Sequence, residues 1–437
     1  MLKFALILVI VFFINCNRNT NPNINWIMGL VQSTAQAALP NPGPNTPNVP
    51  SNPNSPAVTD TQDFTMTISD ESGEPTDFIF NTTQTITLNI LAFNALTDNP
   101  AEGTLVQIID NDRPTVETFF QAVVDSSGNV KGSFTINNTT SQVLLILTYK
   151  GQSYKILVDI KGVYNIRRTV YFITTHQVEQ YADSDGDGVE DSKDDYPNDP
   201  SRSAKIIYPL YTVSYEDLYP RQGDADFNDY SVQVKYEEDL NSKGEVARIR
   251  AEYIHIAKGA GYNHTLNLNL PKVLNANYSL KRFSANGLLE SELNQTISEF
   301  KGIEILPNSS TTISKSNTSR GQSFVFGKKA ELEVILSAPI SKLELGSVPY
   351  DLYLNVLTTK QEIHFAGHYK NANGEDKYLD ANGFPWAILI PGQWRWPYER
   401  TNIHHSYLRF KNWYLSKGME FKDWYLYPEL NEVYPVF

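Results

Sequence analysis

The chain has almost no cysteine, since Cys16 is the only one in 437 residues. An internal disulfide bond is therefore excluded. The apolar run near the start, residues 4–14, is also short, because a helix that crosses a bilayer needs roughly 20 apolar residues. A run of this length preceded by Lys3 is instead typical of the core of an export signal.

The chain also has few positively charged residues. The chain has 36 Lys and Arg against 49 Asp and Glu, which gives a formal net charge of −13, and its basic residues form no evident cluster. Proteins that bind nucleic acid need clustered Lys and Arg to contact phosphates. The composition therefore argues against a nucleic-acid partner.

The single cysteine follows the apolar run directly. Residues 13–16 read Phe-Ile-Asn-Cys, which resembles a bacterial lipobox, although Leu and a small residue are usual where Phe13 and Asn15 stand. We expect residues 1–15 to be a lipoprotein signal peptide and acyl chains on Cys16 to hold the mature chain on the bacterial outer membrane or cell surface. The alternative is an ordinary signal peptide, or an uncleaved anchor, with an incidental cysteine.

A polar, proline-rich segment follows the cysteine. Residues 16–58 are rich in Asn, Pro, Ser and Thr, and repeated prolines remove the backbone donors that helices and sheets require. This segment is predicted to be an extended, semi-rigid tether.

The next part of the chain is predicted to be an immunoglobulin-like β-sandwich over residues 59–165. Short runs rich in β-branched and aromatic residues alternate with turn sequences, a pattern typical of such sandwiches. The expected strands are residues 64–68, 85–90, 104–109, 132–136, 142–149 and 154–160.

Residues 166–437 are predicted to form a larger, mainly β domain that is also sandwich-like. Strands are expected at residues 248–256, 262–270, 332–336, 352–356 and 361–365. One helix is expected at residues 402–415, because apolar side chains recur on one face, Asn402 can cap its start and Gly418 lies just beyond its end. The fold class is therefore mainly β.

The strongest chemical signal is an acidic loop that begins at Asp183. Calcium binds six to eight hard oxygen atoms, and in loops of this kind the ligands recur at alternate positions around a glycine, here Gly188. The flanking sequence does not predict paired helices, so the loop resembles the calcium loops of extracellular repeats rather than an EF-hand. The predicted calcium ligands are Asp183, Asp185, Asp187, the carbonyl of Val189, Asp191 and Asp194, with Asp199 as a further carboxylate downstream. A solvated acidic loop without a metal is the alternative.

A second acidic cluster follows between residues 216 and 229. Alternate oxygen-bearing side chains after Gly223 favour another cation site or the second half of the first one. A pair of glycosidase carboxylates and simple turn capping are the alternatives. The predicted metal ligands are Asp224, Asp226, Asn228 and Asp229.

The two acidic segments and the C-terminal sequence together resemble the LruC-domain family of exported bacterial proteins. The resemblance rests on the Asp183 loop with Tyr-Pro-Asn-Asp-Pro at residues 196–200, on residues 216–230, and on residues 382–388 with Pro397, Glu399 and residues 423–425. Tyr219 stands where Trp is usual, and the His and Gly segment at residues 364–368 is weak. The resemblance implies a surface lipoprotein or secreted protein with immunoglobulin-like modules, and it implies no reaction.

The histidines and tryptophans could form a zinc site or a sugar-binding surface, or they could be packing residues. His364 and His368 are four residues apart, but in a predicted strand this spacing separates them by about 13 Å, so a zinc pair is not expected. Five of the six tryptophans follow Pro385 and would either close a core or stack on sugars. An exposed groove lined by Trp394 or Trp396 would favour the second role.

The sequence as a whole predicts a lipid-anchored exported protein with calcium as its cofactor. We expect it to be a non-enzymatic protein that contacts a host, matrix or envelope protein or a glycan. The alternative is a calcium-dependent carbohydrate-binding module or carbohydrate-active enzyme in residues 166–437.

Overall fold

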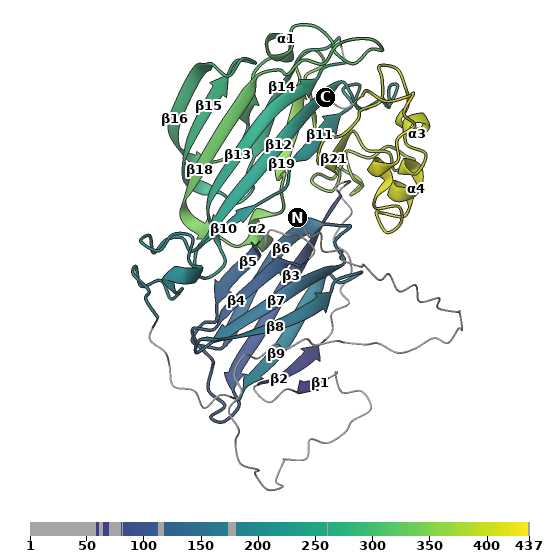
Figure 1. Cartoon of the computed structure of the whole chain (residues 1–437). Coiled ribbons are helices and arrows are strands. Elements are labelled where there is room, and N and C mark those ends of the chain that lie inside the picture. Colours follow the sequence, from purple (N-terminus) through teal and green to yellow (C-terminus); the bar gives the residue numbers. More distant parts are fainter. Residues whose placement is uncertain are drawn as a thin grey trace, which may run out of the picture. The chain divides into compact units, whose positions relative to one another are not determined.

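The computed structural model describes residues 58–60, 64–69, 80, 82–111, 118–173, 181–259 and 261–435. The predicted signal peptide, Cys16 and the tether up to residue 57 lie outside these residues. Strands dominate the described chain, so the predicted mainly β class is confirmed (Figure 1). Within the described part of the chain, no helix is both long and apolar enough to cross a membrane.

Strands β1 to β9 form two sheets, which we call the first sandwich. One sheet has the order β1-β2-β9-β3-β6, with β3 and β9 parallel, and the other has the order β5-β4-β7-β8. The strands are β1 (Val58–Asp60), β2 (Phe64–Ser69), β3 (Thr83–Asn94), β4 (Leu105–Asp110), β5 (Thr118–Val123), β6 (Asn129–Asn137), β7 (Gln142–Tyr149), β8 (Gln152–Asp159) and β9 (Asn165–Phe172). All six strands expected from the sequence are confirmed.

Alternation of apolar and polar residues explains how these two sheets pack. Along β3, every second side chain is buried, which is the period of a strand with one covered face. Ile86 and Phe134 from one sheet share a buried cluster with Val106 and Leu145 from the other. The two sheets therefore pack face to face.

Strands β10 to β21 form a second pair of sheets, the second sandwich. The larger sheet has the order β16-β15-β18-β13-β12-β11-β21, with β10 also paired to β12, and the smaller has the order β17-β14-β19-β20. The strands of the larger sheet are β10 (Ala204–Ile207), β11 (Tyr211–Tyr215), β12 (Tyr230–Leu240), β13 (Val246–Ala257), β15 (Leu274–Phe283), β16 (Leu289–Glu299), β18 (Lys329–Ile340) and β21 (Ala387–Pro391). Those of the smaller sheet are β14 (His264–Asn269), β17 (Ile303–Leu306), β19 (Asp351–Val356) and β20 (Gln361–Ile363).

The second sandwich has one continuous core and one exposed edge. Val232 and Ile249 of the larger sheet lie in the same buried cluster as Leu266 and Leu352 of the smaller sheet. The edge strand β16 differs, because all of its side chains except that of Ile297 are exposed. All five strands expected in this region are confirmed.

Helices are short and few among the described residues. They are α1 (Ser309–Thr312), α2 (Lys342–Leu345), α3 (Ile403–Ser406), α4 (Phe410–Leu415) and the 3-10 turns η1 (Asp191–Lys193) and η2 (Trp424–Leu426). The predicted helix at residues 402–415 is two helices, α3 and α4, because Tyr407 leaves the helical region with φ −139° and ψ 89°. Asn402 caps α3 as expected, accepting the N–H of His404.

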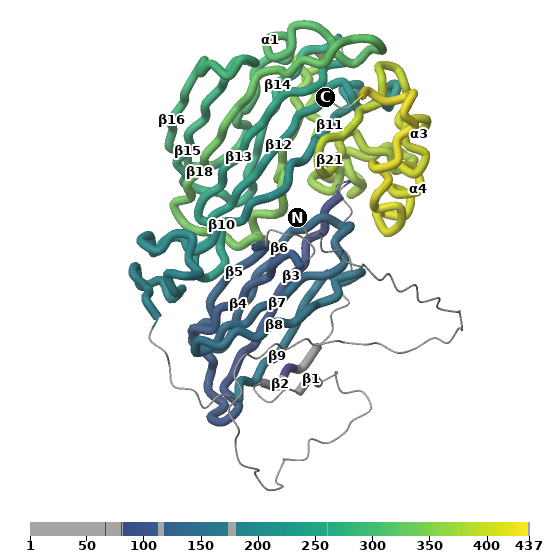
Figure 2. The backbone as a smooth tube through the Cα atoms, viewed as in Figure 1, coloured from purple at the N-terminus to yellow at the C-terminus, as the bar shows by residue number. Residues whose placement is uncertain are grey.

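The C-terminal segment adds a third, aromatic core beside the second sandwich. Trp394, Trp396, Trp413 and Trp424 are all at most 2 % exposed, and they pack with Phe227 and Phe410 in one cluster. Tracing the chain in Figure 2 shows these last residues folding back beside β11 and β21. Tyr407 breaks the predicted helix because its ring stacks on Trp394 and its hydroxyl donates to the Arg395 carbonyl.

Candidate metal centres

The Asp183 loop is shaped by its own aspartates and glycines. Asp183 accepts the N–H groups of Gly186 and Gly188, and Asp185 and Asp187 each accept an N–H two residues further on. Such short-range bonds are what makes Asp a turn residue. Gly188 has φ 95°, a backbone conformation that residues with a Cβ rarely adopt. This explains why the middle of the motif is a glycine.

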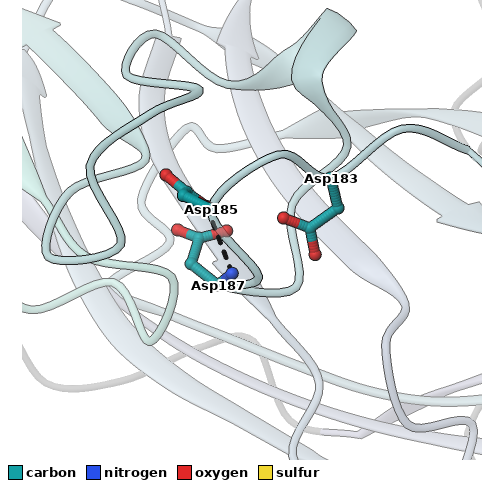
Figure 3. Close-up of side chains that lie close together, drawn as sticks. All are labelled: Asp183, Asp185 and Asp187. Atoms are coloured by element: carbon teal, nitrogen blue, oxygen red, sulfur yellow. Dashed lines mark hydrogen bonds between the residues drawn. The ribbon is translucent and has the colours of Figure 1, made fainter.

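Three carboxylates of this loop converge. Oxygen atoms of Asp183, Asp185 and Asp187 lie within 4.8 Å of one another, and Figure 3 shows the side chains of Asp185 and Asp187 next to each other with Asp183 across the loop. Burial and the charges of Asp194, Asp185 and Asp183 raise the pKa of Asp187 to about 6. Burial and the charges of Asp185, Asp195 and Asp183 also raise the pKa of Asp194, the last predicted ligand of the loop.

The loop leaves three of these oxygen atoms without a partner. Oδ2 of Asp185, Asp187 and Asp194 is buried and accepts no hydrogen bond from any residue that the structure describes. A buried carboxylate oxygen without a donor or cation costs free energy. This donor set, hard oxygens and no nitrogen or sulfur, fits calcium.

The other predicted ligands of the loop have different partners. Both oxygens of Asp191 accept hydrogen bonds from Ser184, through its N–H and its hydroxyl. Val189 buries its side chain and donates its N–H to Asp187. The structure does not bring Asp199 into the group, because its carboxylate accepts from Ser201 and pairs with Arg202.

The Asp183 loop is also tied to strands on both of its sides. Asp195 donates its N–H to the carbonyl of Ser203, which in turn donates to the carbonyl of Leu240 at the end of β12. Gln121 of β5 donates its side-chain amide to the carbonyls of Lys193 and Ser203. A rigid loop would therefore hold the start of the second sandwich in place.

The second acidic cluster lies in the connection between β11 and β12. Oxygen atoms of Glu216, Asp224 and Asp226 lie within 4.8 Å of one another. Phe227 anchors the connection, because its ring packs on Phe384 and Phe410 while its N–H donates to Glu216 Oε1.

This cluster is more deeply buried than the first. Glu216 and Asn228 are fully buried, and Asp226 is 1 % exposed. Burial, reinforced by neighbouring carboxylates, raises the pKa of Asp226 to about 8 and places the pKa values of Glu216 and Asp229 well above their usual range. Asp229 accepts the N–H of Asp217.

The two clusters are separate sites. The first lies beside the Leu240 end of β12, and the second immediately precedes Tyr230 at the start of the same strand. A strand rises about 3.3 Å per residue, so the two ends of the 11-residue β12 beside which the clusters lie are roughly 33 Å apart. This separation argues against the alternative in which the second cluster completes the first.

Two acidic residues of the second cluster were not among the predicted ligands. Glu216 lies upstream of the regular Asp-x-Asp-x-Asn spacing, and Glu399 comes from the C-terminal segment. Glu399 belongs to this neighbourhood, because its Oε2 and Asn228 Oδ1 both lie beside Gly259, and burial and the charges of Asp224 and Asp217 raise its pKa. In the sequence, Glu399 stood out only as one of the C-terminal residues that resemble the LruC-domain family.

A chain of Asp, His and Ser adjoins the second cluster. His264 Nε2 lies 2.9 Å from Asp217 Oδ2, and His264 Nδ1 lies 3.2 Å from Ser309 Oγ. Ser309 and His264 are fully buried, and Ser309 Oγ also accepts the N–H of His264. A hydroxyl in this position cannot reach a substrate from solvent, so the arrangement holds α1 against β14.

The remaining candidate residues of the sequence are also in packing positions. His364 donates from Nδ1 to Asp351 Oδ1 at 2.6 Å and stacks on Tyr353. Trp394 and Trp396 are buried, so they line no exposed groove. The observation that would favour sugar stacking is therefore missing at these two residues.

Comparison with known proteins identifies one family model. Residues 244–425 match the family described as "Domain of unknown function (DUF4842)". This stretch includes Glu399 and excludes the two acidic segments at residues 183–194 and 216–229. No curated protein matches the chain.

A solved structure resembles part of the fold. It is described as the crystal structure of a "putative lipoprotein" from Bacteroides ovatus. The two chains are 13% identical with a TM-score of 0.47, and the match covers 76% of this chain and 99% of the other.

Proposed function

We propose that the chain is an exported, lipid-anchored surface or envelope protein in which a calcium ion in the Asp183 loop fixes the start of the second sandwich. The observation that carries the calcium proposal is the set of three buried Oδ2 atoms, on Asp185, Asp187 and Asp194, with no partner among the described residues. A bound calcium ion would satisfy all three and offset both the burial and the neighbouring charges that raise the pKa of Asp187.

The anchored and interacting roles rest on the sequence. Cys16 after a short apolar run and a proline-rich tether would place the two sandwiches away from a membrane, where they would contact a host, matrix or envelope protein or a glycan. The LruC-domain resemblance supports the same role. We propose a binding function rather than catalysis.

Thermal unfolding of the mature chain, with Cys16→Ser so that it stays soluble, tests the loop site. Calcium at about 100 times its Kd would stabilise the folded state by about 2.7 kcal/mol per site. We expect the midpoint to rise on adding calcium and to rise less in the Asp185→Ala, Asp187→Ala double variant.

Glu190→Ala is the matched control for this experiment. Glu190 is in the same loop but pairs with Lys193, so its removal changes the loop's charge without removing a predicted ligand. The control should keep the full calcium response. Equal responses of the double variant and the unchanged chain would refute the loop site.

A further inference from the structure

We propose that the buried cluster around Glu216 is a second calcium site, independent of the Asp183 loop, and that Glu399 belongs to it. Its ion would fasten the C-terminal segment to the connection between β11 and β12. This proposal does not depend on the function proposed above, because it uses different residues at the other end of β12.

Two oxygen atoms of the cluster point to a missing ligand. Glu216 Oε2 and Asn228 Oδ1 are buried, belong to side chains that are 0 % exposed, and have no hydrogen-bond partner in the described part of the chain. The other ends of these side chains are fixed, since Glu216 Oε1 accepts the Phe227 N–H and Asn228 Nδ2 donates to the Pro397 carbonyl. Rotation cannot easily bring the unsatisfied atoms to water, so their desolvation needs compensation from a bound group.

That bound group should be a cation. Glu216, Asp224 and Asp226 converge within 4.8 Å, and among the described residues none of them forms a salt bridge with Lys or Arg. Like charges at such a distance in a buried site repel strongly unless a cation lies between them or protons neutralise them.

The C-terminal segment reaches the same place. The N–H of Arg400 donates to Asp226 Oδ2 at 2.7 Å, next to Glu399. A Cβ built on Gly259 would lie 1.8 Å from Asn228 Oδ1 and 2.7 Å from Glu399 Oε2, so both oxygens border one small space that only glycine leaves open. Thr318 holds Glu399 there by donating its hydroxyl to Oε2 at 3.0 Å.

The donor set selects calcium over other common metals. Glu216, Asp224, Asp226, Asn228 and Glu399 offer only carboxylate and amide oxygens. Zinc prefers nitrogen and sulfur, and the imidazole of His264, which adjoins the cluster, is bonded to Asp217. Magnesium keeps several water molecules, whereas calcium accepts many protein oxygens at flexible geometry, which suits a buried site with five donors.

Calcium content separates the two sites. The Cys16→Ser mature chain is stripped with chelator, dialysed against micromolar to millimolar calcium, and its bound calcium is counted by elemental analysis. We expect two ions in the unchanged chain, one in the Asp185→Ala, Asp187→Ala variant, and none when Glu216→Gln is added to that variant. If the double variant binds no calcium, the second site is refuted. If the unchanged chain binds one ion and the double variant still binds it, the second site is supported and the loop site is refuted.

Substitutions at partly exposed ligands are less disruptive to folding than Glu216→Gln, so they give a second test of the site. Asp224→Asn and Glu399→Gln are each added to the double variant. Each should lower the calcium affinity of the remaining site by at least about 10- to 100-fold, which is the usual cost of removing a residue that only supports a metal ligand. Glu432→Gln is the control, because Glu432 lies on the same C-terminal segment and pairs with Arg320 at the surface. Near-ultraviolet circular dichroism of the buried tryptophans verifies folding. If Glu399→Gln and Glu432→Gln bind calcium equally well, Glu399 is not a ligand.

Discussion

His255 shows how strongly burial controls a single residue in this protein. Its ring is fully buried and stacks on Tyr230, and burial together with the charge of His264 lowers its pKa from 6.5 to about 3. Below pH 6.5 the His255 imidazole is therefore protonated in the unfolded chain but stays neutral in the folded chain. The contribution of His255 to stability is present above pH 6.5 and is lost as the pH falls toward 3.

This behaviour predicts a pH-dependent stability that one substitution removes. Between pH 7 and pH 5 the free energy of unfolding should fall by about 2 kcal/mol on account of His255, at about 1.4 kcal/mol per pH unit below 6.5. Urea unfolding of the chain and of His255→Gln, both at saturating calcium, measures the difference. Parallel pH dependence in the two chains would contradict the prediction, because carboxylates contribute equally to both.

Residue spacing also explains what the sequence could predict of the metal centres. Asp183, Asp185 and Asp187 lie at alternate positions, and local hydrogen bonds suffice to gather them. Asp199 was predicted as a further ligand because it is a carboxylate just downstream, but it pairs with Arg202, three residues further along the chain. Glu399 joins its cluster through tertiary folding alone, so no local pattern could indicate it.

At the scale of elements, strands were easier to predict than helices. The alternation in β3 depends on one covered face and is visible along the sequence. The helix expected at residues 402–415 had the right capping residue and the right aromatic face, yet the packing of Tyr407 against Trp394 divides it into α3 and α4. Tertiary contacts outweigh helix propensity because propensity differs by less than about 1 kcal/mol per residue.

Helix α4 provides a matched pair of substitutions. Trp413 is fully buried against Trp424, whereas Leu415 on the same helix is 58 % exposed. We expect Trp413→Ala to lower the free energy of unfolding by about 3–5 kcal/mol and Leu415→Ala to change it by about 0.5 kcal/mol or less. Denaturant unfolding decides this, and a similar loss in both variants would mean that the aromatic cluster does not form as described.

At the scale of the whole molecule, the predicted anchor can be tested cleanly because the chain has one cysteine. Cells that express the full chain, grown with a fatty-acid analogue, should incorporate the label and carry the protein in the membrane fraction. Cys16→Ser should abolish labelling, since no other thiol is available. Labelling that persists in this variant would rule out acylation at Cys16.

The edge strand β16 has a consequence for how copies of the molecule meet. Its sequence carries Glu290, Glu292 and Glu299 and no Lys or Arg, and almost every side chain faces solvent. An uncovered strand edge is normally a template for adding another strand. Charged side chains are one means by which proteins discourage this pairing, and β16 carries them along its length, with Glu290 and Glu292 each paired to a lysine. The edge itself therefore opposes the addition of a strand from a second copy.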